Sequence, residues 1–178
     1  MFIRILCPIH FSIFSPALKN EDSADDILIF SSYNPTIALD VIRNEEGCEL
    51  KAYRCSAGVW TIGYGHTGGV REGDAIGKSM ARELLVDDIR KAAEALAPVI
   101  NVPVTDGQYI ALVSLAFNVG ASYVKRNCPK LLRCLNAGDD RGAALQFLDI
   151  TRCNGVVLAG LVNRRKAEAE LFFPGVTK

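Results

Sequence analysis

The chain has 178 residues, which is enough for one domain with a substantial core. Its 20 basic and 20 acidic residues cancel, and no block of like charge predicts binding to nucleic acid. A hydrophobic share of 49% is typical of a folded protein and excludes a disordered chain.

The first 18 residues are rich in Phe and Ile but are interrupted by Arg4 and by prolines. They are too short and too broken to predict a membrane-spanning helix. A basic residue and an apolar run suit an export signal, although no small-x-small cleavage site follows. An export signal or anchor, and a disordered or non-native extension, both remain open. With the acidic linker 19–26, residues 1–33 are expected to form an extension and residues 34–178 the folded domain.

Six cysteines are many for a chain of this size, and none of them forms a Cys-x-x-Cys motif. A zinc site or a thioredoxin-type site is therefore not expected. The number favours an oxidising compartment, with free, buried thiols as the alternative. The cysteines are Cys7, Cys48, Cys55, Cys128, Cys134 and Cys153.

The first predicted helix begins at Asn34-Pro35, because Asn is a favoured N-cap and Pro is favoured at the first helical position. Its apolar face consists of Ile37, Val41 and Ile42. Glu46 falls in the last turn, where the helix dipole disfavours negative charge. If the carboxyl is also partly buried, both effects raise its pKa, which suits a general acid. The alternative is an exposed glutamate beside Glu45.

From Glu49 to Gly77 the chain is rich in glycine and aromatic residues, which predicts a small β-hairpin lobe. Strand alternation places Trp60 on the opposite face from Thr61, in the core of this lobe. Glu46, Cys55 and Thr61 are nine and six residues apart. At this spacing a helix end, a loop and a strand can bring an acid, a polarisable group and a hydroxyl to one cleft.

The rest of the chain predicts helices. Ser79 is expected to cap a helix that ends at Pro98, and Thr105 with Gln108 forms a capping box for an apolar helix that ends at Gly120. Shorter helices follow at about 129–138, 141–148 and 161–172. A β lobe joined to a helical lobe is an α+β architecture, and a polymer would lie in the cleft between the lobes.

Three segments together resemble the phage-type lysozymes, the endolysins of tailed bacteriophages. The first is Glu46-Gly47, then Cys55 and Thr61, then the Gly-x-Gly-His of residues 63–66. The second and third segments are residues 117–120 and 160–165. They follow the family's order over roughly residues 36–173.

Most members of that family have Asp where this chain has Cys55. A branch of phage enzymes carries Cys there and a second Cys just after the Glu-Gly, which here is Cys48. The closest resemblance is to that branch. The usual account of glycoside hydrolysis uses two carboxylates, and this motif contains one.

The resemblance implies a lysozyme-like fold and a glycoside hydrolase that cuts the β-1,4 bond between N-acetylmuramic acid and N-acetylglucosamine in peptidoglycan. Glu46 would protonate the leaving oxygen, while Cys55 and Thr61 would position or polarise water and stabilise the cationic sugar. Arg164 would pair with Glu46 and hold it in place. No metal ion or organic cofactor is implied, and a monomer is expected.

The resemblance also places Phe117 and Asn118 against the sugar chain, and Gly65 and His66 are expected to bind substrate by lining the cleft. His66 could instead fix a loop, and Phe117 could be plain core. The enzyme would act on the host wall, in the periplasm or after release, following export or permeabilisation of the membrane, with a cytoplasmic stage before release. An apolar segment such as residues 1–18 often acts as a weak anchor in the related enzymes.

The cysteines predict a redox switch. A Cys48–Cys55 disulfide would use up the Cys55 thiol and inactivate the enzyme, and Cys7 could release Cys55 by exchange. The alternative is that Cys48 never pairs. Two other functions are considered: a catalytically silent murein-binding module or regulatory relic, supported by Cys in place of Asp, and a thiol-redox protein, supported by the cysteine count alone.

Overall fold

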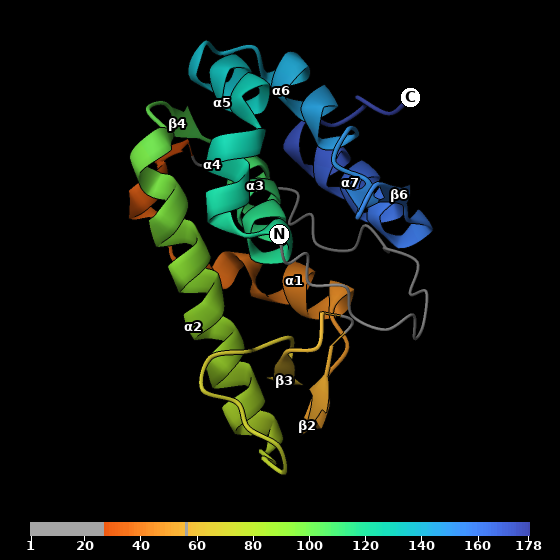
Figure 1. Cartoon of the computed structure of the whole chain (residues 1–178). Coiled ribbons are helices and arrows are strands. Elements are labelled where there is room, and N and C mark those ends of the chain that lie inside the picture. Colours follow the sequence, from red (N-terminus) through yellow and green to blue (C-terminus); the bar gives the residue numbers. More distant parts are fainter. Residues whose placement is uncertain (1–26, 56) are drawn as a thin grey trace.

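The computed structural model describes residues 27–55 and 57–178 (Figure 1). The predicted export or anchor segment 1–18, with Cys7, lies outside the described residues. The described residues form seven α-helices and three two-stranded antiparallel sheets. The predicted α+β architecture, a β-hairpin lobe beside a mainly helical lobe, is confirmed.

The small lobe is built on one hairpin. Strand β2 (Glu49–Arg54) pairs with β3 (Trp60–Gly63), with Tyr53 opposite Thr61 and an irregularity between Glu49 and Tyr53. The lobe packs closely on α2, since a Cβ added to Gly63 would lie 3.5 Å from the backbone of Ala81. The hairpin is thereby held by a helix that also reaches the other lobe.

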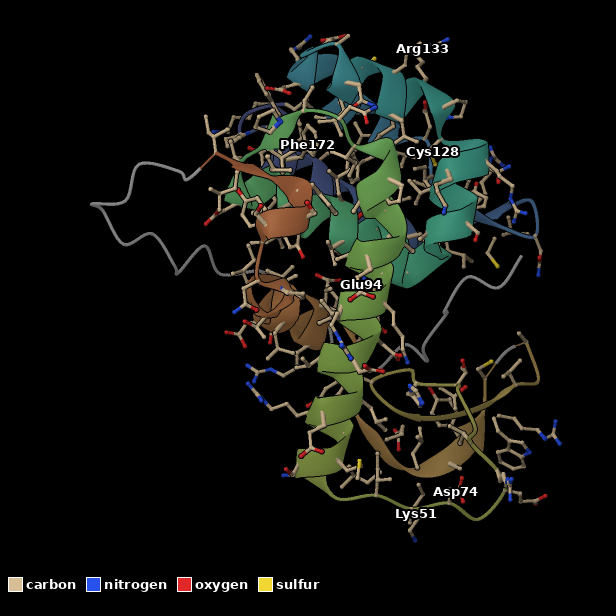
Figure 2. The ribbon with its side chains drawn as sticks, turned by 90° about the vertical axis from the view of Figure 1, so that its left-hand side faces the viewer. Lys51, Asp74, Glu94, Cys128, Arg133 and Phe172 are labelled. Atoms are coloured by element: carbon tan, nitrogen blue, oxygen red, sulfur yellow. The ribbon has the colours of Figure 1, made fainter. Side chains whose placement is uncertain are left out.

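Helix α2 (Lys78–Leu96) is the element that joins the two lobes. Figure 2 shows Lys51 and Asp74 at the hairpin end of the molecule, Arg133 in the helical lobe, and Glu94 on α2 between them. The buried residues of α2 recur at helical spacing, and they are Ala81, Leu85, Ile89, Ala93 and Leu96. The predicted cap at Ser79 is wrong: Gly77 is the N-cap, and the Ser79 hydroxyl bonds Glu83 inside the helix.

Helix α3 (Asp106–Val119) is the centre of the helical lobe, and eleven of its residues are buried. Its predicted capping box is confirmed, because the Thr105 side chain accepts from the Gln108 N–H and the Gln108 side chain accepts from the Thr105 N–H. The helix ends at Gly120, whose φ of 88° favours glycine. Full burial of a side chain such as Leu, Val or Phe stabilises the folded state by about 1.5–3 kcal/mol.

Short elements complete the helical lobe. Around α3 lie α1 (Leu39–Glu45), α4 (Ala121–Asn127), α5 (Pro129–Asn136), α6 (Asp140–Phe147) and α7 (Ala159–Phe172). The 3₁₀ turns η1 (Phe30–Ser32) and η2 (Pro35–Ala38) precede α1, and η3 (Ala97–Val99) follows α2. The small hairpin of β5 (Arg152–Cys153) and β6 (Val156–Val157) lies between α6 and α7. Helix α4 and this hairpin are absent from the sequence-based prediction.

The predicted boundary after residue 33 falls too late in the chain. Strand β1 (Leu28–Ile29) pairs with β4 (Pro103–Val104), and Phe30 and Tyr33 are buried in the core. The Tyr33 hydroxyl also donates to the Val104 carbonyl at 2.7 Å. Residues 28–33 therefore belong to the folded domain. Among the described residues, no helix combines the length and the apolar character needed to cross a bilayer.

Candidate active site

Glu46 lies where α1 meets the hairpin lobe. It is the first residue after the helix, with extended backbone angles (φ −112°, ψ 134°), so the prediction that it occupies the last helical turn is off by one residue. Its exposed fraction is 6%, whereas Glu45 is exposed. The alternative of an exposed glutamate is therefore excluded at position 46.

Arg164 of α7 holds the Glu46 carboxyl. Its Nη1 donates to Glu46 Oε1 at 2.7 Å, and the two side chains are 7% and 2% exposed. Burial alone would lower the pKa of Arg164, but the charges of Glu46 and Glu168 raise it overall, so the guanidinium stays charged. The ion pair that the resemblance implies is present. It favours the carboxylate form of Glu46, whereas burial and the end of α1 favour the neutral acid.

Cys55 and Thr61 meet at the loop that connects β2 to β3. The Cys55 N–H donates to the Val59 carbonyl at 3.0 Å, and the Thr61 hydroxyl donates to the same carbonyl at 3.0 Å. Thr61 is buried, and Cys55 is half-buried. Burial alone would raise the pKa of Cys55, but hydrogen bonds from the Ala57 and Val59 backbone and from Thr61 lower it overall. This loop therefore favours the thiolate at Cys55.

Trp60 is half-buried and does not form the core of the small lobe, which corrects the expectation from strand alternation. The guanidinium carbon of Arg54 lies 4.7 Å from the centroid of its ring. Such a stack favours a partly solvated aromatic residue over a core position. Ile62, which is 2% exposed, is the buried apolar side chain of β3 instead.

The Gly-x-Gly-His segment is a tight turn. Ile62 and His66 exchange two backbone hydrogen bonds of 2.9 Å, and the chain between them needs φ values of 63° at Gly63 and 91° at Gly65. His66 Nδ1 lies 3.0 Å from Asp88 Oδ2, and its Nε2 donates to the Gly68 carbonyl at 2.9 Å. Both ring nitrogens are engaged in fixing the loop on α2, and a contact of His66 or Gly65 with substrate stays a prediction.

Phe117 and Asn118 lie inside the helical lobe rather than on its surface. Their exposed fractions are 4% and 2%, and Asn118 Oδ1 accepts from Arg165 Nη2 at 3.1 Å. In this conformation a sugar would meet the surface above them and not the side chains themselves. Direct contact with substrate stays a prediction for both residues.

The five cysteines of the described residues are free thiols. Cys48 is exposed beside Tyr64, whose pKa is raised by its own burial and by the neighbouring Cys48. Cys48 precedes β2 and Cys55 follows it. An extended strand of that length separates the two Cα atoms by roughly 20 Å, against about 6 Å in a disulfide. The predicted Cys48–Cys55 bond therefore requires the β2–β3 hairpin to open.

Three buried polar residues near Glu46 are absent from the sequence-based site. Ser114, Arg165 and Glu168 are 0%, 0% and 3% exposed and surround Arg164. The Arg-Arg pair with Glu three and four positions later places all three charges on one side of α7. That spacing is the signal that could have revealed the two α7 residues, whereas Ser114 lies 54 residues from Glu168 and carries no such signal.

Comparison with known proteins gives consistent results. The family model described as phage lysozyme matches residues 43–168. The endolysin of Acyrthosiphon pisum secondary endosymbiont phage 1 is 42% identical over 138 residues, which are 75% of this chain and 93% of that protein. The structure of the endolysin from Escherichia coli O157:H7 phage FAHEc1 superimposes with a TM-score of 0.70 at 34% identity, covering 78% of this chain and 91% of the other.

A second solved structure, the muramidase domain of SpmX from Asticaccaulis excentricus, also has a TM-score of 0.70. It is 35% identical and covers 76% of this chain and 94% of that chain. The chain therefore has the lysozyme-like fold that its sequence predicts.

Proposed function

The chain belongs to the phage lysozyme family, and we propose that it is an N-acetylmuramidase that cuts the β-1,4 bond between N-acetylmuramic acid and N-acetylglucosamine in peptidoglycan. Similarity to endolysins and to a muramidase domain supports a peptidoglycan hydrolase of the lysozyme type. The matched segment includes Glu46, Cys55, Thr61 and Arg164. The observation that carries the proposal is the buried Glu46 carboxyl held by Arg164 where the two lobes meet.

Glu46 is the proton donor in this proposal. A glycosidic oxygen leaves only if it is protonated as the bond breaks, and a carboxyl group shielded from water is suited to supply that proton. The Arg164 contact at Oε1 fixes the orientation of the Glu46 carboxyl where the two lobes meet.

Cys55 takes the place of the second carboxylate. Its lowered pKa favours a thiolate, which would supply the negative charge that a second carboxylate supplies in the usual account of glycoside hydrolysis. A thiolate there can stabilise the cationic sugar or accept a proton from the attacking water. Thr61, which is hydrogen-bonded to the same loop, would orient that water.

The wall of the host cell is the proposed site of action, with peptidoglycan as the partner and the chain acting as a monomer. Residues 1–18 would carry the chain to the membrane or through it, and the lytic step would follow in the periplasm. The turn at Gly65 and His66 and the surface above Phe117 and Asn118 would flank the bound glycan.

Clearing of purified peptidoglycan tests the proposal. The wild type should clear a wall suspension, and Glu46→Gln should lose activity by about 10²–10⁴-fold, because the amide keeps the shape but donates no acid proton. Glu49→Gln, which changes an exposed carboxylate three residues further on, should clear walls like the wild type. Binding of walls without clearing by the wild type would contradict the proposal and favour a silent murein-binding module.

A further inference from the structure

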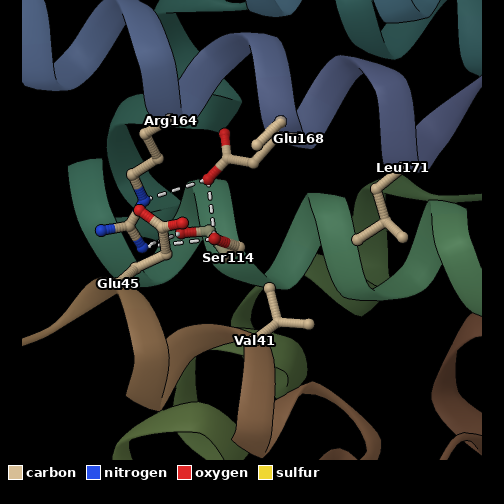
Figure 3. A pocket seen from close by; sticks show the side chains of 7 residues that line it. Val41, Glu45, Ser114, Arg164, Glu168 and Leu171 are labelled. Atoms are coloured by element: carbon tan, nitrogen blue, oxygen red, sulfur yellow. Dashed lines mark hydrogen bonds and ion pairs between the residues drawn. The ribbon is translucent and has the colours of Figure 1, made fainter. Parts of the chain in front are cut away.

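Glu168 is a buried carboxylate that the proposed chemistry does not use. It lies on α7, one turn after Arg164, and its side chain is 3% exposed. Figure 3 shows it beside Arg164 and Ser114, with Glu45 and Val41 of α1 nearby. A carboxylate in such a place is costly unless it is fully paired, so its partners indicate its role.

The partners of Glu168 come from two helices. Its Oε1 accepts from Ser114 Oγ of α3 at 2.7 Å, from Arg164 Nε at 3.2 Å and from Arg165 Nη2 at 3.1 Å. Its Oε2 lies 2.9 Å from Arg165 Nε, an ion pair without the alignment of a hydrogen bond. These groups, Glu168, Arg164, Arg165 and Ser114, form what we call the Glu168 network.

The network fixes the plane of the Arg164 guanidinium. All three nitrogens of that group are engaged: Nε with Glu168, Nη1 with Glu46, and Nη2 with the Oγ and carbonyl of Ser114 at 3.2 and 3.4 Å. A guanidinium is planar, so anchoring Nε and Nη2 determines where Nη1 points. Glu168 and Ser114 hold one edge of the group while Glu46 occupies another.

Glu168 also compensates the positive charges of the two arginines in the network. Arg164 and Arg165 are adjacent and buried, and burial together with the charge of Arg164 lowers the pKa of Arg165 to about 10, although Glu168 opposes this. When Glu46 carries its proton, Glu168 is the carboxylate within the network that pairs with both arginines. Without it, two adjacent buried cations would share no carboxylate within the network.

A cavity of about 10 Å³ adjoins the network, lined by Val41, Glu45, Ser114, Arg164 and Glu168 among others (Figure 3). It has room for about one water molecule. No substrate could enter a space of this size, so Glu168 cannot act on the glycan directly.

We propose that Glu168 is a positioning residue for Glu46: it orients Arg164 and balances its charge, and Ser114 holds Glu168 in the required rotamer. The proposal rests on the proposed function of Glu46 as the acid. The competing explanation is that the network only stabilises the packing of α7 on α3. The two explanations differ in what happens to the folded enzyme.

Steady-state hydrolysis of a soluble peptidoglycan oligosaccharide distinguishes them, with the folded fraction of each variant determined by circular dichroism well below its unfolding midpoint. Glu168→Gln should lower kcat about 10- to 100-fold and leave KM within about twofold, since misplacing a catalytic group by a fraction of an ångström lowers the rate without changing binding. Ser114→Ala, which removes the hydroxyl that bonds both Glu168 and Arg164, should lower kcat by about fivefold. The milder variant decides the question if Glu168→Gln does not fold.

Glu170→Gln is the matched control. Glu170 is on the same helix, and its carboxylate bonds Gly175 and Thr177 of the C-terminal segment, not Arg164. It should keep wild-type kcat. The inference is overturned if folded Glu168→Gln and Ser114→Ala both keep wild-type kcat, or if Glu170→Gln loses as much as they do. These outcomes leave the proposed function intact, whereas an inactive wild type or a fully active Glu46→Gln would contradict the function itself.

Discussion

Cys55 owes its chemistry to the backbone of its own loop. No arginine or lysine is among the groups that lower its pKa; the amides of Ala57 and Val59 and the Thr61 side chain do so against the effect of burial. A sulfur anion held by backbone N–H groups is a weaker base than an ordinary thiolate at the same site. The thiolate of Cys55 therefore forms at a lower pH than the thiolate of an ordinary cysteine.

The titration of Cys55 can be followed by alkylation. Because its pKa is lowered, the thiolate forms at a lower pH than in an ordinary cysteine, and the rate with iodoacetamide should reach half its maximum at correspondingly lower pH. Cys128, whose pKa burial raises to about 11, should stay unlabelled across that range. Peptide mapping after timed alkylation gives both rates. A Cys55 profile at or above that of a model thiol would contradict the assignment.

Substitution at Cys55 tests whether a negative charge is sufficient. Cys55→Asp should retain lytic activity, because it keeps a negative charge at the same position. Cys55→Ala should lose most of it. The measurement is the initial rate of wall clearing at equal concentrations of folded protein. Equal rates for the wild type and both variants would show that Cys55 is a bystander.

The β2–β3 hairpin is the element on which the predicted redox switch depends. Cys48 and Cys55 bracket β2, so their disulfide and the paired strand exclude each other. Oxidation would therefore disrupt the strand pairing that places Tyr53 opposite Thr61, and it would displace the loop that contains Cys55. The switch stays a prediction. In this structure the disulfide would open the β2–β3 hairpin, which is a larger change than the closing of a small loop.

A reductant titration checks the switch. Protein oxidised under mild conditions should be inactive with Cys48 bonded to Cys55, and activity should return as reductant breaks that bond. Non-reduced peptide mapping beside a clearing assay follows both changes. Activity indifferent to reductant, with both cysteines found as free thiols, would exclude the switch, and a Cys7–Cys48 bond in active protein would indicate that exchange had occurred.

Helix α3 gives a prediction of stability. Thr105→Ala removes the hydroxyl that accepts the Gln108 N–H and should lower the free energy of unfolding by about 1 kcal/mol. Thr105→Ser, which keeps the hydroxyl, should lie close to the wild type. Urea unfolding monitored by circular dichroism measures the difference. A loss below about 0.3 kcal/mol in the alanine variant would indicate that the cap contributes little here.

Elements with local signals were predictable from the sequence. The capping box at Thr105 and the proline at position 129 depend on neighbours within four residues, and both helices start where expected. Helix α4 was missed because Gly120 is a legitimate stop for α3, and nothing local shows that the same residue also begins the next helix. The predicted cap at Ser79 was wrong because a serine near a helix start can form a hydrogen bond within the helix instead of capping it.

At the scale of the whole molecule, the site could be predicted only where a family motif marks it. Glu46, Cys55 and Thr61 lie in one motif, and Arg164 was found through the resemblance alone. Ser114 lies 54 residues from Glu168, and Arg164 lies 118 residues from Glu46, so their contacts exist only in the folded chain. Core burial was one of the two alternatives for Phe117, but the sequence did not indicate the burial of Asn118, because α3 is apolar on nearly every side.

The two-lobe arrangement explains why a site at the junction is sensitive to distant residues. Glu46 belongs to the segment that connects α1 to the hairpin, while its partner Arg164 belongs to α7 of the helical lobe. The ion pair therefore links the two parts of the chain that a bound glycan would contact, and α2 fixes their spacing. Any change that moves α7 relative to α1 should affect the acid before it affects the overall fold.

The central claim, that Glu46 is the acid of an N-acetylmuramidase, is tested most directly by the new reducing ends formed from purified peptidoglycan. After digestion and reduction with borohydride, the wild type should yield the alcohol of N-acetylmuramic acid, and Glu46→Gln should yield less than about a tenth as much. Release of the alcohol of N-acetylglucosamine instead, or undiminished release by Glu46→Gln, would contradict the account.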